Sequence, residues 1–254
     1  MSGLLELRGV SRQFGGLRAL ADVDLSVAQG EVVGLIGPNG AGKTTLVNVI
    51  TGVHPASAGS VVFDGADVTR LQPWQAARRG IARTFQIVQP FPEMTVLENV
   101  AAAAMFAGAT RYGAAAETFA LEQLRFVGLD DVAGKRAATL TLAMRKRLEF
   151  AKGLAMRPKL LLLDEVNAGL NATEVDHALE LIRGITARGV TIIIIEHLMK
   201  VVLSVCTRIV VLHHGELIAE GSPQSIVRDP RVVQAYLGRR YAAAQPPAQG
   251  AAHG

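Results

Sequence analysis

The stretch from residue 37 to residue 44 constrains this chain more than any other. It reads G-P-N-G-A-G-K-T and fits the pattern G-x-x-x-x-G-K-[S/T] at every fixed position. An apolar run over residues 32–36 comes just before it and is expected to form a buried strand. Residues 45–51 are expected to open a helix. This strand–loop–helix order indicates a phosphate-binding loop (P-loop) and not an ordinary glycine-rich turn.

The chemistry of such a loop comes from its backbone and from two side chains. Glycines let successive N–H groups turn towards one point, and the helix N-terminus adds free N–H groups and partial positive charge. Lys43 is expected to reach the β- and γ-phosphates of a nucleotide, and the Thr44 hydroxyl to bind Mg²⁺. The residues predicted to bind nucleotide here are Asn39, Gly40, Ala41, Gly42, Lys43, Thr44 and Thr45.

A second signal lies at residues 160–165, where four leucines are followed by Asp164 and Glu165. Parallel sheets place ligand sites at the carboxyl ends of their strands. Asp164 is therefore expected to hold Mg²⁺, and Glu165 to polarise the water that attacks the γ-phosphate. An Asp-Glu pair alone would favour a solvated strand end, but the P-loop earlier in the chain favours the catalytic interpretation.

The apolar pattern predicts an α/β fold with a mainly parallel sheet. Residues 160–163, 190–195 and 209–212 are continuous apolar runs, which are typical of strands covered on both faces. A helix capped by Asn171, with Glu174 three residues on, is expected between the first two. The first third predicts short antiparallel strands. Residues 73–154 predict helices, with an alanine-rich linker as the alternative for part of that stretch.

Composition adds a few bounds. The chain has 254 residues, a formal net charge of +4 and a single cysteine, Cys206, so a reducing compartment is expected. The first residues lack the pattern of a secretory signal. No apolar run approaches the roughly 20 residues that span a bilayer. Residues 241–254 are expected to be a disordered tail, because they are rich in Ala, Pro, Gln and Gly.

Further segments carry a family resemblance. They are residues 12–20, the P-loop with Thr45, and residues 83–86, 94–100, 147–149, 163–165, 168–171, 195–197 and 221–238. Over residues 4–237 the chain resembles the nucleotide-binding subunit of an ATP-binding cassette (ABC) transporter. More closely, it is similar to the ATPase subunits of branched-chain amino-acid importers. The fold implied is a P-loop NTPase core with an antiparallel β subdomain and a helical subdomain.

The resemblance also implies roles for single residues. Phe14 would stack on adenine, with a core position as its alternative. Gln86 would lie at the Mg²⁺ ion and the attacking water, and His197 would hydrogen-bond the γ-phosphate. Without the family, Gln86 would be an ordinary loop residue, and His197 could equally be a partly exposed loop residue. Lys43, Gln86, Glu165 and His197 are thus the expected catalytic residues, and Thr44, Gln86 and Asp164 the expected metal ligands. Residues 91–94 would face a membrane subunit, or else plug the helical region.

One loop departs from the family pattern. The family's signature loop reads roughly L-S-G-G-Q, and residues 140–144 read L-T-L-A-M. In ABC dimers this loop caps the ATP of the partner subunit. Thr141 keeps the hydroxyl, Ala143 replaces a glycine that should approach the γ-phosphate, and Met144 replaces a polar side chain. Thr141 and Ala143 are the predicted nucleotide contacts here, and we expect weak capping and an asymmetric dimer with a different ATPase subunit.

The function expected from the resemblance is the ATP-hydrolysing motor of an ABC importer, with ATP and Mg²⁺ as cofactors. Expected partners are membrane permease subunits, a second ATPase subunit and a solute-binding protein, and no nucleic acid. The expected place is the cytoplasmic face of the inner membrane. Residues 1–240 would form one domain, with the helical subdomain inserted at about residues 88–155. The alternative is a soluble or regulatory ABC ATPase that mainly binds nucleotide.

Overall fold

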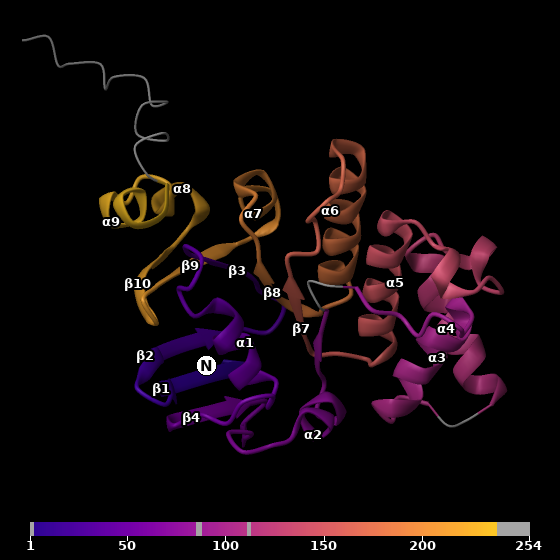
Figure 1. Ribbon diagram of the computed structural model, residues 1–254, viewed down its shortest axis with the longest axis horizontal. Coiled ribbons are helices and arrows are strands. Elements are labelled where there is room, and N and C mark those ends of the chain that lie inside the picture. The colour runs from indigo at the N-terminus through magenta and orange to yellow at the C-terminus, as the bar shows by residue number, and fades with distance from the viewer. Residues whose placement is uncertain (1–2, 85–87, 111–112, 238–254) are drawn as a thin grey trace, which may run out of the picture.

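The computed structural model describes residues 3–84, 88–110 and 113–237 (Figure 1). Its main sheet has six strands in the order β10-β9-β3-β8-β7-β6. Strands β9, β3, β8, β7 and β6 run parallel, and β10 is antiparallel to β9. The strands are β3 (Val32–Ile36), β6 (Ile81–Arg83), β7 (Leu160–Asp164), β8 (Thr191–Ile195), β9 (Arg208–His213) and β10 (Glu216–Gly221).

Both faces of this sheet are buried, as the continuous apolar runs predicted. Along β3, Val33 and Leu35 belong to one hydrophobic cluster, whereas Val32 and Ile36 belong to the other. The same alternation holds along β7 and β8. Side chains of successive residues point to opposite faces of a strand, so a strand covered on both sides must be apolar throughout.

A second, antiparallel sheet has the order β2-β1-β4-β5. Its strands are β1 (Leu5–Phe14), β2 (Leu17–Val27), β4 (Ala58–Phe63) and β5 (Ala66–Asp67). It shares one hydrophobic cluster with helix α1 (Lys43–Ile50) and one face of the main sheet. The P-loop helix is therefore enclosed between the two sheets (Figure 1).

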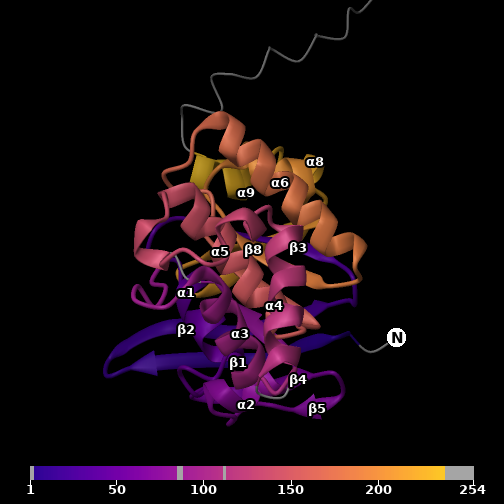
Figure 2. The same cartoon turned by 90° about the vertical axis from the view of Figure 1, so that its right-hand side faces the viewer.

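Helices α3 (Val96–Phe106), α4 (Ala114–Phe126) and α5 (Leu142–Ala155) form a separate group beyond β7, at the right of Figure 1, and Figure 2 shows α3 and α4 from the front. The helices after α1 are α2 (Pro73–Arg78), α3 (Val96–Phe106), α4 (Ala114–Phe126), α5 (Leu142–Ala155), α6 (Ala172–Ala187), α7 (Met199–Val205), α8 (Pro223–Ile226) and α9 (Pro230–Val232). Within the described part of the chain, none of them combines the length and the hydropathy that a bilayer span needs.

The sequence patterns located most elements but not all their limits. The predicted cap of α6 is confirmed. The Asn171 side chain accepts a hydrogen bond from the Glu174 backbone amide, and the Glu174 carboxylate accepts one from the Asn171 backbone amide. Strand β6 was missed, because three residues between helices carry no periodic signal. The division into a domain of residues 1–240 with an inserted helical part stays a prediction, and the expected tail lies outside the described residues.

Candidate nucleotide-binding site

The P-loop leaves the carboxyl end of β3, and two of its glycines leave no room for side chains. Gly37 has φ of 152°, and a Cβ there would lie 2.0 Å from the Leu212 carbonyl oxygen. Gly42 has φ of 103°, and its Cβ would lie 2.6 Å from the Ala19 carbonyl oxygen. The loop backbone is thus pressed against β9 and β2. Asn39, Gly40 and Thr44 remain exposed on its outer side, whereas Ala41 is buried and Thr45 half-buried.

Lys43 reaches back over this loop from the first turn of α1. Its Nζ donates hydrogen bonds to the carbonyl oxygens of Gly37, at 2.7 Å, and Pro38, at 3.0 Å. Burial lowers the pKa of Lys43, and the charges of Glu165 and Asp164 oppose that effect. The structure therefore brings the P-loop lysine into the electrostatic range of both predicted carboxylates, at one edge of the sheet.

Asp164 ends β7 and is held by an arginine that sequence reasoning did not single out. Arg83 Nη2 lies 2.7 Å from Asp164 Oδ2, and Arg83 Nη1 donates to Asn48 Oδ1 at 2.5 Å. The Asp164 amide donates to Thr84 Oγ1 at 3.3 Å. No signal could have paired Arg83 with Asp164, because the short strand β6 that aligns them was not predicted.

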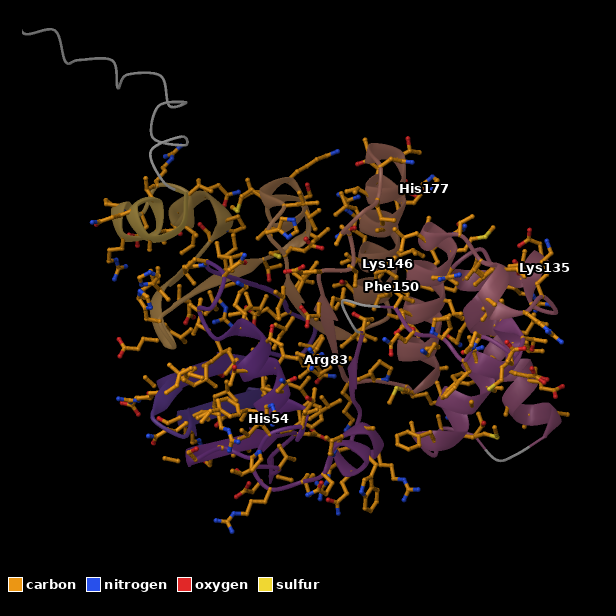
Figure 3. The ribbon with its side chains drawn as sticks, viewed as in Figure 1. His54, Arg83, Lys135, Lys146, Phe150 and His177 are labelled. Atoms are coloured by element: carbon orange, nitrogen blue, oxygen red, sulfur yellow. The ribbon has the colours of Figure 1, made fainter. Side chains whose placement is uncertain are left out.

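Glu165 begins the loop after β7 with a left-handed backbone, at φ of 48°. Its amide donates to the Ile195 carbonyl at 2.9 Å, and its carbonyl accepts from Lys146 Nζ at 3.2 Å. Lys146 comes from α5 and is buried (Figure 3). This loop is therefore fixed by β8 on one side and by the helix of the predicted signature loop on the other.

Two further buried polar residues join this loop to the end of β8. Asn167 donates to Glu196 Oε1 from its amide, at 3.1 Å, and from Nδ2, at 2.7 Å. Glu196 is 1% exposed, and burial raises its pKa. The next residue, His197, is exposed beside these loops. Sequence reasoning named Glu196 only as part of the matching segment and missed Lys146 and Asn167, since buried polar contacts leave no periodic pattern.

The remaining predicted site residues are Thr141, Ala143, Phe14 and Gln86. Thr141 caps α5, with its Oγ1 accepting from the Met144 amide at 3.3 Å, and Ala143 lies in the first turn of that helix. Phe14 is 38% exposed, so the alternative of a core position is wrong. Its ring centre lies 4.4 Å from the guanidinium carbon of Arg12 and 5.2 Å from the ring centre of His54. Gln86 lies outside the described residues. Its role and those of the other site residues stay predictions.

Metal-ligating side chains are sparse in this region. Among the residues that the structure describes, no three or more His, Cys, Asp and Glu side chains gather as a metal cluster. Mg²⁺ is held in many nucleotide sites by one or two carboxylates, with phosphate oxygens and waters. One carboxylate, Asp164, together with the exposed P-loop threonine Thr44, fits that ligand set.

Comparison with known proteins identifies the family of this chain. A family model described as ABC transporter matches residues 20–168. The chain is 39% identical to BraF of Pseudomonas aeruginosa, a high-affinity branched-chain amino acid transport ATP-binding protein, over 92% of this chain and 98% of BraF. The chain belongs to the ABC transporter family. The expected fold and family are thereby confirmed, and the chain is a nucleotide-binding ATPase of that family.

Other matches agree with this assignment. LivG of Escherichia coli K12, also a high-affinity branched-chain amino acid transport ATP-binding protein, is 38% identical over 92% of this chain and 98% of LivG. The crystal structure of an ATP-binding cassette of an ABC transporter, in its ADP conformation, superimposes with a TM-score of 0.86. It is 32% identical, covering 94% of this chain and all of that one. A model described as branched-chain amino acid ATP-binding cassette transporter matches residues 216–242.

Proposed function

We propose that this chain is the ATP-hydrolysing subunit of an importer for branched-chain amino acids or related solutes. The observation that carries the proposal is the order of the parallel sheet: β3, which leads into the P-loop and Lys43, and β7, which ends at Asp164 next to Glu165, lie on either side of β8 and end at the same edge. The solute class comes from the relatives BraF and LivG and from the family match over residues 216–242.

The residues divide the reaction between them. The P-loop N–H groups and Lys43 would bind the phosphates, Thr44 and Asp164 would hold Mg²⁺, and Glu165 would orient or deprotonate the attacking water. When bound, Mg²⁺ supplies charge neutralisation on the phosphate oxygens. His197 would contact the γ-phosphate, and Gln86, which lies outside the described residues, would contact the ion and the water as the family resemblance implies. This is in-line transfer of a phosphoryl group to water, which depends on positioning and charge.

An open pocket of about 490 Å³ supports docking of a membrane permease. It lies between α2, α3 and α5, and its lining is mostly apolar and includes three exposed aromatic side chains, Trp74, Phe91 and Phe106. Exposed aromatic patches of this kind mark interaction sites. An apolar segment of a permease fits here, which would hold the chain at the cytoplasmic face of the membrane as a peripheral subunit. A solute-binding protein would complete the system on the opposite face.

The composition of the α5 N-terminus supports a dimer of two different ATPase subunits. Ala143 adds a Cβ in the first helical turn, where the family places a glycine, and Met144 offers no strong donor to a phosphate. Light scattering on the Glu165→Gln chain with Mg·ATP tests this point. We expect a monomer that binds ATP but does not pair with itself. An ATP-dependent homodimer would overturn the heterodimer.

Reconstitution tests the proposal as a whole. The chain, its permease subunits and a second ATPase subunit would be placed in liposomes with ATP inside them, so that the ATPase face is internal. With the solute-binding protein outside, uptake of radiolabelled leucine is then measured. We expect ATP-dependent uptake that the Glu165→Gln variant loses and that the surface variant Arg231→Met keeps. Full uptake by Glu165→Gln would instead favour a regulatory cassette that only binds nucleotide.

A further inference from the structure

One buried guanidinium joins three elements of the nucleotide site. Arg83 ends β6, and its side chain is 10% exposed, while that of Asp164 on β7 is 7% exposed. Its Nη2 lies 2.7 Å from Asp164 Oδ2, and its Nη1 donates to Asn48 of α1 at 2.5 Å. The P-loop helix and the predicted metal-binding carboxylate are thus linked through a single side chain.

The same side chain lines the apolar pocket. Arg83 stands in its wall together with Thr51, Trp74 and Phe91. Figure 3 shows Arg83 at the centre of the molecule, between the antiparallel sheet and the helical side. A molecule that fills this pocket would therefore meet the residue that holds Asp164.

The charge of Arg83 matters as much as its position. Arginine stays protonated in proteins, and its planar fork can hold two acceptors at once. In a site this buried, the guanidinium offsets the negative charge of Asp164 that would otherwise attract a cation. Oδ2 accepts from Arg83, so a metal ion at Asp164 would share this carboxylate with the guanidinium.

We propose that Arg83 is a positioning residue for ATP hydrolysis that also links the apolar pocket to the metal-binding carboxylate. It orients Asp164 against α1 and limits the affinity of Asp164 for a divalent cation. Because coupling between two sites is reciprocal, metal binding at Asp164 alters the pocket, and filling the pocket alters metal affinity. The natural occupant of the pocket rests on the proposed function, but the link is a property of this chain alone.

The first experiment titrates the nucleotide-free chain with Mn²⁺ and follows free Mn²⁺ by electron paramagnetic resonance. Removing the guanidinium charge in Arg83→Met should tighten Mn²⁺ binding about tenfold. A neighbouring opposite charge shifts the pKa of a carboxylate by about one unit or more, and one pKa unit is a factor of ten. Asp164→Asn in the same chain should abolish that gain. General damage weakens binding, so the sign of the change separates the two explanations.

A matched control breaks an arginine–aspartate pair elsewhere. Arg231 pairs with Asp229 at the same 2.7 Å, but on the surface at α9. Arg231→Met should leave Mn²⁺ affinity at the wild-type value. Unchanged or weaker Mn²⁺ binding by folded Arg83→Met would overturn the proposal.

The second experiment uses the only tryptophan of the chain, Trp74, which is 46% exposed in the pocket wall. Addition of Mg²⁺ should change Trp74 fluorescence in the wild-type chain, and Arg83→Met should bind the ion without that change. If Arg83→Met fails to fold, Arg83→Lys decides the question. It keeps the charge but lacks the planar fork whose two nitrogens bond Asn48 and Asp164, so the Trp74 response should fall at least twofold.

A wild-type chain without a Trp74 response, or an undiminished response in the Arg83 variants, would overturn the link. Neither measurement contains a permease or a transported solute. If the reconstituted wild-type transporter takes up no leucine but Trp74 of the wild-type chain still responds to Mg²⁺, the result counts against the proposed function alone. Normal uptake without the response would count against the link alone.

Discussion

Replacing Lys146 by methionine tests the buried polar network behind Glu165. The side chain is 5% exposed, and its Nζ donates to the Glu165 carbonyl at 3.2 Å. Burial lowers the pKa of Lys146, and the charge of Glu196 opposes this most among the neighbouring carboxylates. Lys146→Met keeps a long, unbranched side chain but removes its charge. Glu196 then stays buried without this nearby cation.

The expected loss of stability follows from these contacts. A hydrogen bond from a charged donor contributes about 1.5–3 kcal/mol. Breaking one side of a buried charge arrangement costs up to about 5 kcal/mol. We therefore expect a loss of about 3 kcal/mol, which for a chain of this size lowers Tm by about 6–12 °C. The turnover rate for ATP should also fall with little change in KM, because the Glu165 loop loses a support while the P-loop is untouched.

Calorimetry and steady-state ATPase assays measure both effects. Lys159→Met is the matched control, because its pair with Asp64 lies on the surface and should contribute less than about 1 kcal/mol. Glu196→Gln added to Lys146→Met should recover part of the loss, since it removes the charge left uncompensated. A cost below about 1 kcal/mol for Lys146→Met, or strict additivity in the double variant, would refute this reasoning.

Three other changes have expected outcomes. Ala143→Gly should raise the ATPase rate of the assembled dimer, and an unchanged rate would remove the argument for weak capping. Gly37→Ala should abolish binding of a fluorescent ATP analogue, because its Cβ would lie 2.0 Å from the Leu212 carbonyl, and normal binding would contradict the loop geometry. Glu196→Gln tests the raised pKa of Glu196. The folded chain holds that proton more tightly than the unfolded chain, so wild-type stability falls as pH rises from the unfolded pKa through the folded one. The Tm of Glu196→Gln relative to wild type should therefore be higher at pH 8 than at pH 5, and a constant difference would contradict it.

Much of the fold could be predicted because its signals are local. The glycine spacing of the P-loop, the apolar runs of β7, β8 and β9, and the Asn171 cap each depend on neighbouring residues. The strand limits were less accessible. β1 extends to Phe14, because its pairing with β2 continues where the apolar pattern stops.

The candidate site could be predicted only where a motif carries it. Lys43, Asp164 and Glu165 stand in motifs, and the structure brings them to one edge of the sheet. Arg83 and Lys146 meet this site from β6 and α5, many residues away in the chain. Their contacts depend on which elements pack together, and a single sequence shows no such pairing.

The central claim is that this chain hydrolyses ATP with Glu165 acting on the attacking water. The most direct measurement is release of labelled phosphate from γ-³²P-ATP by the assembled transporter, comparing wild type with Glu165→Gln. We expect the variant to keep ATP bound and to release almost no phosphate, while the wild type turns over. Equal phosphate release by the two would contradict it.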